Sequence, residues 1–241
     1  EYNKKLLYLT DNVDIALRLK ADGRLVVPIL SKKNIPFSFS DFKYVISNPE
    51  DISEDYYVKL WQRLFCKPWH ILTTKRCRLR EITFSDIPAI QKIYTHPSST
   101  KFMAPFFPAD TVPKEFVKNY INNVYSLFEF GTWIVERQSD NQIIGLVGFN
   151  YREDFSKLEI SEKSYPLLEH PELGFIIDAP HRHMGYAYEV CRAAMDYGMS
   201  ELGFEKVYAI AHPHNIPSVK VLKKLSFENF GTDNFIWYYK F

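Results

Sequence analysis

The stretch that decides the fold is ELGFIIDAPHRHMGYA, which runs from Glu172 to Ala187. Its apolar part, Leu173 to Ile177, has the length and composition of a buried strand and stops at Asp178. A turn containing Gly185 follows, and the residues from Tyr188 to Leu202 predict a helix. The first backbone N–H groups of a helix lack intrahelical partners and carry the positive end of the helix dipole. We therefore expect an anion-binding loop between this strand and this helix.

The composition of the whole chain limits the class of protein to which it can belong. The chain has 241 residues, 46% of them hydrophobic, which is enough apolar material for one large domain or two small ones. Its 30 basic and 29 acidic residues nearly cancel, so we expect no nucleic-acid partner, and any anionic ligand must be held locally. No uninterrupted apolar run is long enough to cross a bilayer, so no membrane partner is expected.

The cysteines indicate the compartment. Cys66, Cys77 and Cys191 show neither C-x-x-C spacing nor a disulfide framework. This pattern is typical of free thiols in a reducing cytoplasm, and none of the three has a neighbouring base that would mark a catalytic nucleophile. We therefore expect a cytoplasmic protein.

Residues 1–68 predict a small α/β domain of unknown role, and residues 69–241 predict a second domain. The first has apolar strands at Leu6–Leu9, Leu25–Leu30 and Tyr44–Ile46, and helices at Asn12–Ala21 and from Asp51 or Ser53 to about Cys66. This β-α-β-β-α order indicates a partly parallel sheet. Asp11 and Ser31, which follow the first two strands, faintly resemble the layout of the HAD-like phosphatases. The segment lacks a second acid at D-x-D spacing, so a helix cap at Asp11 or Asn12 explains the acid better.

For the second domain, the sequence from Cys77 onward predicts the element order β-α-α-β-β-β-α-β-α-β. The strands are expected at Cys77–Ile82, Thr132–Glu136, Ile143–Phe149, Leu173–Ile177, Lys206–Ala211 and Phe235–Tyr239. Ser85-Asp86 is expected to cap the first helix. The second opens at Pro113 and carries Phe116, Tyr120, Val124 and Leu127 at the spacing of one buried helix face.

Three segments carry a family resemblance. Arg182-x-x-Gly185-x-Ala187 resembles the R/Q-x-x-G-x-G/A pyrophosphate loop of the GNAT acyl-CoA-dependent N-acetyltransferases. Asn215-x-x-Ser218, followed by Leu222, Lys224, Leu225 and Phe227, resembles the second motif of that family. Thr74 to Arg80 is similar to the T-x-R-L-x-L-R start of the branch that contains the ribosomal-protein alanine acetyltransferases. The resemblance implies an α/β mixed sheet, the GNAT acyl-CoA N-acyltransferase fold, preceded by the small β-α-β-β-α unit.

The resemblance also implies acetyl-CoA as co-substrate, no metal, and a set of binding residues. The pyrophosphate would lie on the backbone of the loop residues Arg182, His183, Met184, Gly185, Tyr186 and Ala187. The backbone of Ile176 and Ile177 would bind the pantetheine amides, on a strand that splays from its neighbour. Asn215 would contact the pantetheine or fix its loop, although a helix N-cap explains this residue equally well. Ser218 would lie near the far end of the cofactor.

Acetyl transfer to an amine needs a proton acceptor, because a primary amine is mostly protonated at neutral pH. Glu172 is the first candidate: it faces the same side of its strand as Gly174, and the family often carries a glutamate there. An ordinary strand-end acid is the alternative. His212 and His214 follow the carboxyl end of a strand and are the other candidates, against a plain loop.

One position departs from the family pattern. Leu222 stands where many GNAT members carry a tyrosine acid. Either the thiolate leaves unaided, or Tyr238 or Tyr239 substitutes. The aromatic residues from Phe102 to Phe107, together with Trp133, are expected to be core rather than the wall of an acceptor site.

The sequence therefore predicts an N-acetyltransferase that moves an acetyl group from acetyl-CoA directly to a small-molecule or peptide amine. No nucleophile stands out for a covalent intermediate. The alternative is a non-catalytic acyl-CoA-binding or sensing module. The acceptor amine stays open, and so does a homodimer.

Overall fold

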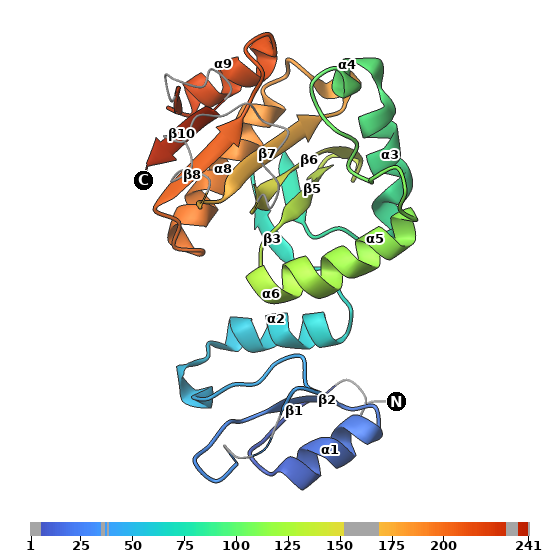
Figure 1. Cartoon of the computed structure of the whole chain (residues 1–241), viewed down its shortest axis with the longest axis vertical. Coiled ribbons are helices and arrows are strands. Elements are labelled where there is room, and N and C mark those ends of the chain that lie inside the picture. Colours follow the sequence, from blue (N-terminus) through green and yellow to red (C-terminus); the bar gives the residue numbers. More distant parts are fainter. Residues whose placement is uncertain (1–5, 35–36, 38, 152–168, 230–235, 241) are drawn as a thin grey trace. The chain divides into compact units, whose positions relative to one another are not determined.

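The computed structural model describes residues 6–34, 37, 39–151, 169–229 and 236–240 (Figure 1). The chain splits into two compact units, Glu1–Trp69 and His70–Phe241. In the first unit, β1 (Leu7–Thr10) and β2 (Leu25–Pro28) pair in parallel, with α1 (Val13–Ala21) as the crossover. A 3₁₀ turn at Pro49–Asp51 and α2 (Glu54–Leu64) complete the unit.

The third strand predicted for this unit is reduced to a single contact. Ile46 makes one parallel bridge to Ile29. Of the predicted segment only Ile46 is buried, in a small core with Val27 and Leu60, while Val45 is exposed. A segment that buries only one side chain gains too little packing energy to form a longer run of strand pairing.

The cap of α1 is Asn12, whose side chain accepts a hydrogen bond from the amide of Ile15 at 3.0 Å. Asp11 accepts a hydrogen bond through its backbone carbonyl. The buried Asn34 side chain donates to this carbonyl at 2.7 Å and to the Ile29 carbonyl at 2.9 Å. The polar residues after β1 and β2 therefore join the two strand ends. Ser53 caps α2 by accepting from the amide of Tyr56 at 3.2 Å.

The second unit is built on one mixed sheet with the strand order β3-β4-β5-β6-β7-β8-β10-β9. The strands are β3 (His70–Thr73), β4 (Cys77–Arg80), β5 (Thr132–Arg137), β6 (Ile143–Asn150), β7 (Glu172–Ile177), β8 (Lys206–Ile210), β9 (Glu228–Asn229) and β10 (Ile236–Lys240). The helices are α3 (Ile87–Thr95), α4 (Pro97–Thr100), α5 (Pro113–Asn119), α6 (Ser126–Phe128), α8 (Tyr186–Ser200) and α9 (Ile216–Lys224). The predicted strand residue Phe235 lies outside the described residues.

β7 and β8 pair in parallel, whereas their other neighbours pair antiparallel. β7 is in register with β6 along its whole length, from Glu172 opposite Asn150 to Ile177 opposite Gly145. With β8 it shares one register pair, Glu172 with Tyr208. The two strands therefore part after the first residue of β7.

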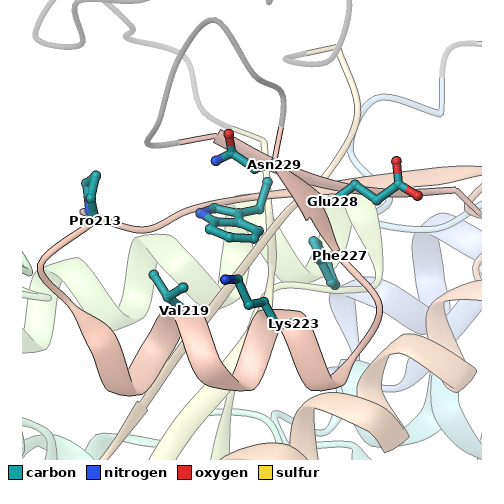
Figure 2. Close-up of a pocket in the computed structure, with 7 residues that line it drawn as sticks. Pro213, Val219, Lys223, Phe227, Glu228 and Asn229 are labelled. Carbon is teal, nitrogen blue, oxygen red and sulfur yellow. The ribbon is translucent and has the colours of Figure 1, made fainter.

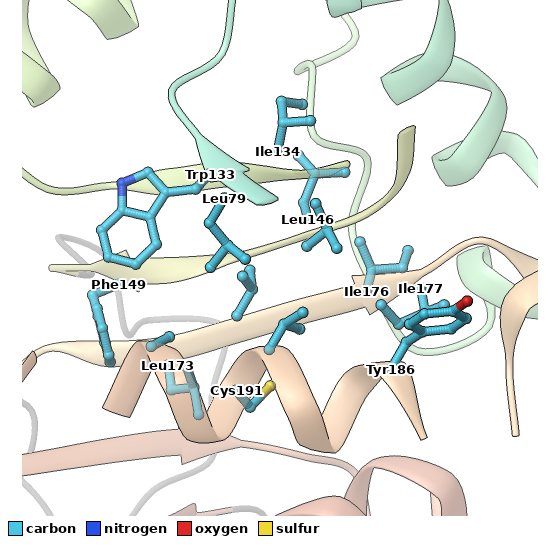
Figure 3. Close-up of a cluster of buried hydrophobic side chains, with 14 of the residues drawn as sticks. Leu79, Trp133, Ile134, Leu146, Phe149, Leu173, Ile176, Ile177, Tyr186 and Cys191 are labelled. Carbon is cyan, nitrogen blue, oxygen red and sulfur yellow. The ribbon is translucent and has the colours of Figure 1, made fainter. Parts of the chain in front are cut away.

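α8 packs against β6 and β7, and the core lies between them (Figure 3). Leu173 and Cys191 meet there, and the Trp133 ring stacks edge-on against Phe149 and Tyr197. Trp133 is fully buried, so it belongs to the core and not to an acceptor wall. Leu173 faces α8 (Figure 3). Since side chains alternate along a strand, Glu172, Gly174 and Ile176 face the side of the sheet away from α8.

The helix predicted from Pro113 to Leu127 is interrupted. A π-helical turn, Tyr120–Tyr125, separates α5 from α6. A π turn holds more residues than an α turn, so every side chain after it is rotated. Tyr125 is therefore fully buried, with its hydroxyl donating to the Thr132 carbonyl, whereas Leu127 is 73% exposed. The prediction that Leu127 belongs to the buried face was wrong.

Asp86 is the N-cap residue of α3, as predicted, but its side chain makes no capping hydrogen bond to that helix. Thr83 and Asp86 form a capping box, in which the amide of Thr83 donates to the Asp86 carboxylate at 2.7 Å. The buried Asp86 also pairs with Arg80 at 2.8 Å. Ser85 bonds Thr83 through its hydroxyl and caps no helix among the described residues.

Candidate active site

The loop between β7 and α8 ends on a glycine with a left-handed backbone. Gly185 has φ +83° and occupies the N-cap position of α8, where no side chain caps the helix. His183, two residues earlier, also has a positive φ of 62°. Glycine adopts this conformation without steric cost, and its backbone can approach a ligand closely. The first amides of α8 are thus left without a side-chain acceptor, as an anion site requires.

Arg182, the charged residue of the motif, is engaged inside the protein. Its Nε donates to the carbonyl of Ile177 at 2.8 Å. Its two terminal nitrogens donate to the hydroxyls of Ser98 and Ser99 in α4, the second at 2.7 Å. The side chain therefore ties the loop to β7 and α4.

A second anchor comes from the turn between β3 and β4. The Glu189 carboxylate, in the first turn of α8, accepts from the Thr74 hydroxyl at 2.7 Å, the Arg76 amide at 2.8 Å and the Arg76 Nε at 2.6 Å. Partial burial acts to raise the pKa of Glu189, but the hydrogen bonds from Thr74 and Arg76 outweigh it and lower that pKa. Sequence reasoning missed Glu189, although the similarity of Thr74 to Arg80 to a family segment had marked the other half of this anchor.

The edge of β7 that faces β8 offers backbone groups. The Asp178 amide donates to Ile144 on the β6 side, and the Tyr208 amide donates to the Pro171 carbonyl on the β8 side. Because consecutive backbone groups of a strand point to opposite edges, Phe175 and Ile177 face β8, beyond the point where the strands part. Ile176 faces β6. Of the two strand residues predicted to bind, Ile177 and not Ile176 therefore has its backbone groups on the edge that faces β8, and its carbonyl already accepts a hydrogen bond from Arg182.

Glu172 lies in a polar row that crosses the sheet. It is half-buried and in register with Asn150 on β6 and Tyr208 on β8. The hydroxyl of the fully buried Tyr208 donates to the Glu172 carboxylate at 3.5 Å. Tyr238 on β10 is opposite Tyr208 and continues the row. Tyr208 is thus the nearest phenol along this row to the proposed base, and the sequence analysis did not select it.

The loop after β8 holds the two histidines. Nδ1 of the exposed His212 accepts from the His214 amide at 3.1 Å, and its ring lies 5.5 Å from Phe102 and 5.2 Å from His214. His212 is four residues beyond Tyr208, the partner of Glu172, which corresponds to roughly 13 Å of extended chain. His212 thus lies beyond the end of β8, whereas Glu172 is level with the middle of that strand.

Asn215 is the N-cap of α9. Its side chain accepts from the amide of Ser218 at 3.5 Å, and its carbonyl accepts from the amide of Val219 at 3.0 Å. Of the two interpretations of Asn215, the structure contains the helix cap. Ser218 is half-buried in the first turn of α9.

Position 222, where many GNAT members carry a tyrosine acid, is inaccessible to solvent. Leu222 is fully buried in the core. The Tyr238 hydroxyl donates to the Glu228 carboxylate at 2.9 Å, and this hydrogen bond raises the pKa of Tyr238. Tyr239 packs its ring on Phe227. Of the two proposed substitutes, Tyr238 is the one in the row that contains Glu172.

Burial makes two of the cysteines poor nucleophiles at neutral pH. Burial raises the pKa of Cys77 to about 11, and it raises that of the fully buried Cys191 further. All three cysteines are free thiols, and Cys66 is exposed in the first unit. Among the described residues, no three His, Cys, Asp or Glu side chains gather as metal ligands would. Every helix in the described ranges is too short or too polar to cross a bilayer.

An open cavity of about 540 Å³ lies elsewhere, between α9 and the strands β9 and β10 (Figure 2). Its lining includes Val219 and Lys223 on α9, and Glu228 and Asn229 on β9. None of the predicted site residues lines it. The cavity is therefore separate from the edge of β7.

The chain is similar to several known proteins. A model of the family described as "Acetyltransferase (GNAT) domain" matches residues 76–228. The uncharacterised N-acetyltransferase YnaD of Bacillus subtilis strain 168 is 27% identical over 160 residues, which cover 66% of this chain and 84% of that protein. Ribosomal-protein-S5-alanine acetyltransferase from Vibrio fischeri is 16% identical with a TM-score of 0.52, covering 70% of this chain and 95% of that chain. Spermidine N-acetyltransferase from Vibrio cholerae, solved with CoA and spermine, is 18% identical with a TM-score of 0.51, covering 68% of this chain and 95% of that chain.

These matches confirm the fold that the sequence predicts. The family model covers more than half of the chain and spans the strands from β4 to β8, including the β7–α8 loop. The two solved structures share the fold over most of their own length. The chain therefore belongs to the GNAT family of N-acetyltransferases.

Proposed function

We propose that this chain moves an acetyl group from acetyl-CoA directly to an amine. The observation that carries the proposal is the junction of β7 and α8: β7 parts from β8 after one register pair and runs into a helix without a side-chain cap. The free strand edge and the free helix amides follow one another along the chain. A pantetheine arm followed by a pyrophosphate needs these two kinds of donor in this order.

The residues present fit acetyl-CoA at both ends of this path. Phe175 and Ile177 offer backbone groups for the pantetheine amides, and the amides of Tyr186 and Ala187 offer donors for the pyrophosphate. No atom of the described residues lies within 4 Å of the position that a Cβ on Gly174 would take, so among these residues the face of β7 beside Glu172 has room for a ligand. The thioester supplies an activated acetyl group, and the protein has to place it.

The transfer needs one base. The neutral amine attacks the thioester carbonyl, so an N–C bond forms while the C–S bond breaks. The proton on nitrogen passes through a water to the Glu172 carboxylate. The electron pair of the broken bond leaves on sulfur, which tolerates the charge because thiols have a low pKa. The raised pKa values of Cys77 and Cys191 favour this direct route over an acetylated cysteine.

The acceptor is a primary amine on a protein N-terminus or on a small molecule. Proteins with this fold include one named for an alanine of a ribosomal protein and one named for spermidine. The chain carries nearly balanced charge and gives no preference between them. A cytoplasmic location and a homodimer belong to the same proposal, and size-exclusion chromatography with light scattering tests the dimer.

The activity is tested by thiol release from acetyl-CoA in the presence of an amine panel: peptides with N-terminal alanine or serine, spermidine, an aminoglycoside and free amino acids. With the best acceptor, Glu172→Gln should lower kcat by about 10²-fold, the scale of general-base catalysis. Glu205→Gln is the matched control, because this exposed acid precedes β8 much as Glu172 opens β7. An unchanged rate for Glu172→Gln would remove this residue as the base.

The buried Leu222 favours a second candidate, a non-catalytic acyl-CoA-binding module. A site without the usual acid can still hold the co-substrate. Binding of acetyl-CoA without turnover of any amine in the panel would support this module over the enzyme. Absence of binding would exclude both.

A further inference from the structure

The cation that faces the phosphate loop comes from a different part of the sequence. Arg76 lies in the turn between β3 and β4, and its Nη1 donates to the carbonyl of Met184 at 2.9 Å. Its Nε donates to Glu189, and its guanidinium carbon lies 4.2 Å from the centre of the Tyr186 ring. One side chain thus contacts the residue before Gly185, the residue after it and the first turn of α8.

The remaining nitrogen of Arg76 points at the glycine. Nη2 lies 3.5 Å from the position that a Cβ on Gly185 would occupy. No described residue accepts a hydrogen bond from this nitrogen. The Arg76 side chain is 39% exposed, so the guanidinium is partly accessible to solvent.

Arg182 differs from Arg76 because none of its guanidinium nitrogens is without a protein partner. Each of its three guanidinium nitrogens donates to a protein oxygen, on Ile177, Ser98 or Ser99. A planar guanidinium with two nitrogens held and one directed outward is already oriented for a phosphate oxygen and loses little side-chain entropy on binding. Arg76, which lies outside the β7–α8 loop, therefore directs a nitrogen at this loop, whereas Arg182, which lies within it, does not.

We propose that Arg76 is the cation that binds the pyrophosphate of acetyl-CoA, and that Arg182 only positions the loop. This inference rests on the proposed function and names a further binding residue of the same site. Glu189 holds Arg76 from the Nε side, so the carboxylate orients the guanidinium and leaves Nη2 free.

The test compares acetyl-CoA with acetyl-pantetheine, which has the same thioester and arm but lacks the pyrophosphate. NMR titration reads both affinities, including millimolar ones. Arg76→Gln should raise the Kd for acetyl-CoA by roughly tenfold or more, the scale of a lost hydrogen bond to a charged group, and leave the Kd for acetyl-pantetheine unchanged. Arg192→Gln is the control, because Arg192 lies on the exposed face of α8 and pairs with Asp196.

Arg76→Lys covers the case in which Arg76→Gln does not fold. It keeps a charge near Glu189 but loses the fork, so its Kd for acetyl-CoA should rise several-fold while that for acetyl-pantetheine stays constant. Unchanged acetyl-CoA binding in either folded variant, or an equal loss for both compounds, would overturn the role of Arg76 and leave the proposed function standing. If the wild-type protein binds neither compound, the proposed function itself fails.

Discussion

β7 and β8 are neighbouring parallel strands, and each runs through a short loop into a helix. At the start of α9, the Asn215 side chain accepts from the amide of Ser218, so this helix is capped by its own chain. At the start of α8, Gly185 supplies no side chain, and the loop around it is held by Arg76 from the β3–β4 turn and by its own Arg182. The two junctions share a topology and differ in whether their helix amides are already satisfied.

This difference separates a structural helix start from one that can bind an anion. A capped helix gains its stability within the chain, and an uncapped one leaves donors that a ligand can complete. The uncapped start needs outside support because a glycine loop has many conformations. Arg182 and the pair of Arg76 with Glu189 provide that support.

The largest effect is expected from Gly185→Ala. A left-handed φ costs a non-glycine residue about 1–2 kcal/mol, so the loop will relax away from its present conformation and the Kd for acetyl-CoA should rise roughly tenfold. Gly203→Ala is a matched control, since Gly203 has φ +68° and no described atom lies within 4 Å of the added Cβ. Calorimetry with acetyl-CoA distinguishes them: similar losses of stability but unequal affinities are expected. Equal affinities would remove the special role of the α8 junction.

A smaller effect is expected from Glu189→Gln, which weakens the anchor without touching the loop backbone. The lowered pKa of Glu189 means that its ionised contacts stabilise the folded protein fully above its ordinary value of 4.5. This contribution is lost as the pH falls through the lowered pKa. The difference in unfolding free energy between wild type and Glu189→Gln should be about 1–2 kcal/mol at pH 7 and should shrink below about pH 4.5.

Urea unfolding over this pH range measures that difference. The exposed Glu205 provides the control, and Glu205→Gln should give a difference near zero throughout. A difference for Glu189→Gln that grows as the pH falls would contradict the assigned contacts.

The smallest effect on the ligand is expected from Asn215→Ala. Loss of the α9 cap should cost about 1 kcal/mol of stability, and Asn215→Asp should restore it. Acetyl-CoA affinity should change less than twofold, because the capped junction does not hold the pyrophosphate. A large loss of affinity with little loss of stability would instead support the direct contact between Asn215 and the pantetheine.

Local patterns predict most of this fold and only the outline of its site. The strand Leu173–Ile177 and the loop glycine are encoded in adjacent residues, and the structure contains both. The π turn at Tyr120–Tyr125 has no such local signal, so the predicted buried face that included Leu127 was wrong.

The contacts that give the site residues their roles are long-range. The motif predicts that Arg182 is a phosphate ligand. Its hydrogen-bond partners in α4, however, lie more than 80 residues away in the chain. Arg76 and Glu189 are 113 residues apart, and neither sequence position reveals the other. Whether Phe175 or Ile176 faces β8 depends on the register with β6, which the alternation of hydrophobic residues does not determine.

The most direct test of the central claim is an NMR titration of the isotope-labelled protein with acetyl-CoA, following the backbone amides at the two junctions. The amides of Tyr186 and Ala187 should show the largest shifts, and that of Ser218, which already donates to Asn215, should move much less. Acetyl-pantetheine should leave the α8 amides nearly unchanged. If acetyl-CoA binds while Tyr186 and Ala187 stay unmoved, or if the α9 amides move most, the assignment of the pyrophosphate to the uncapped start of α8 is wrong.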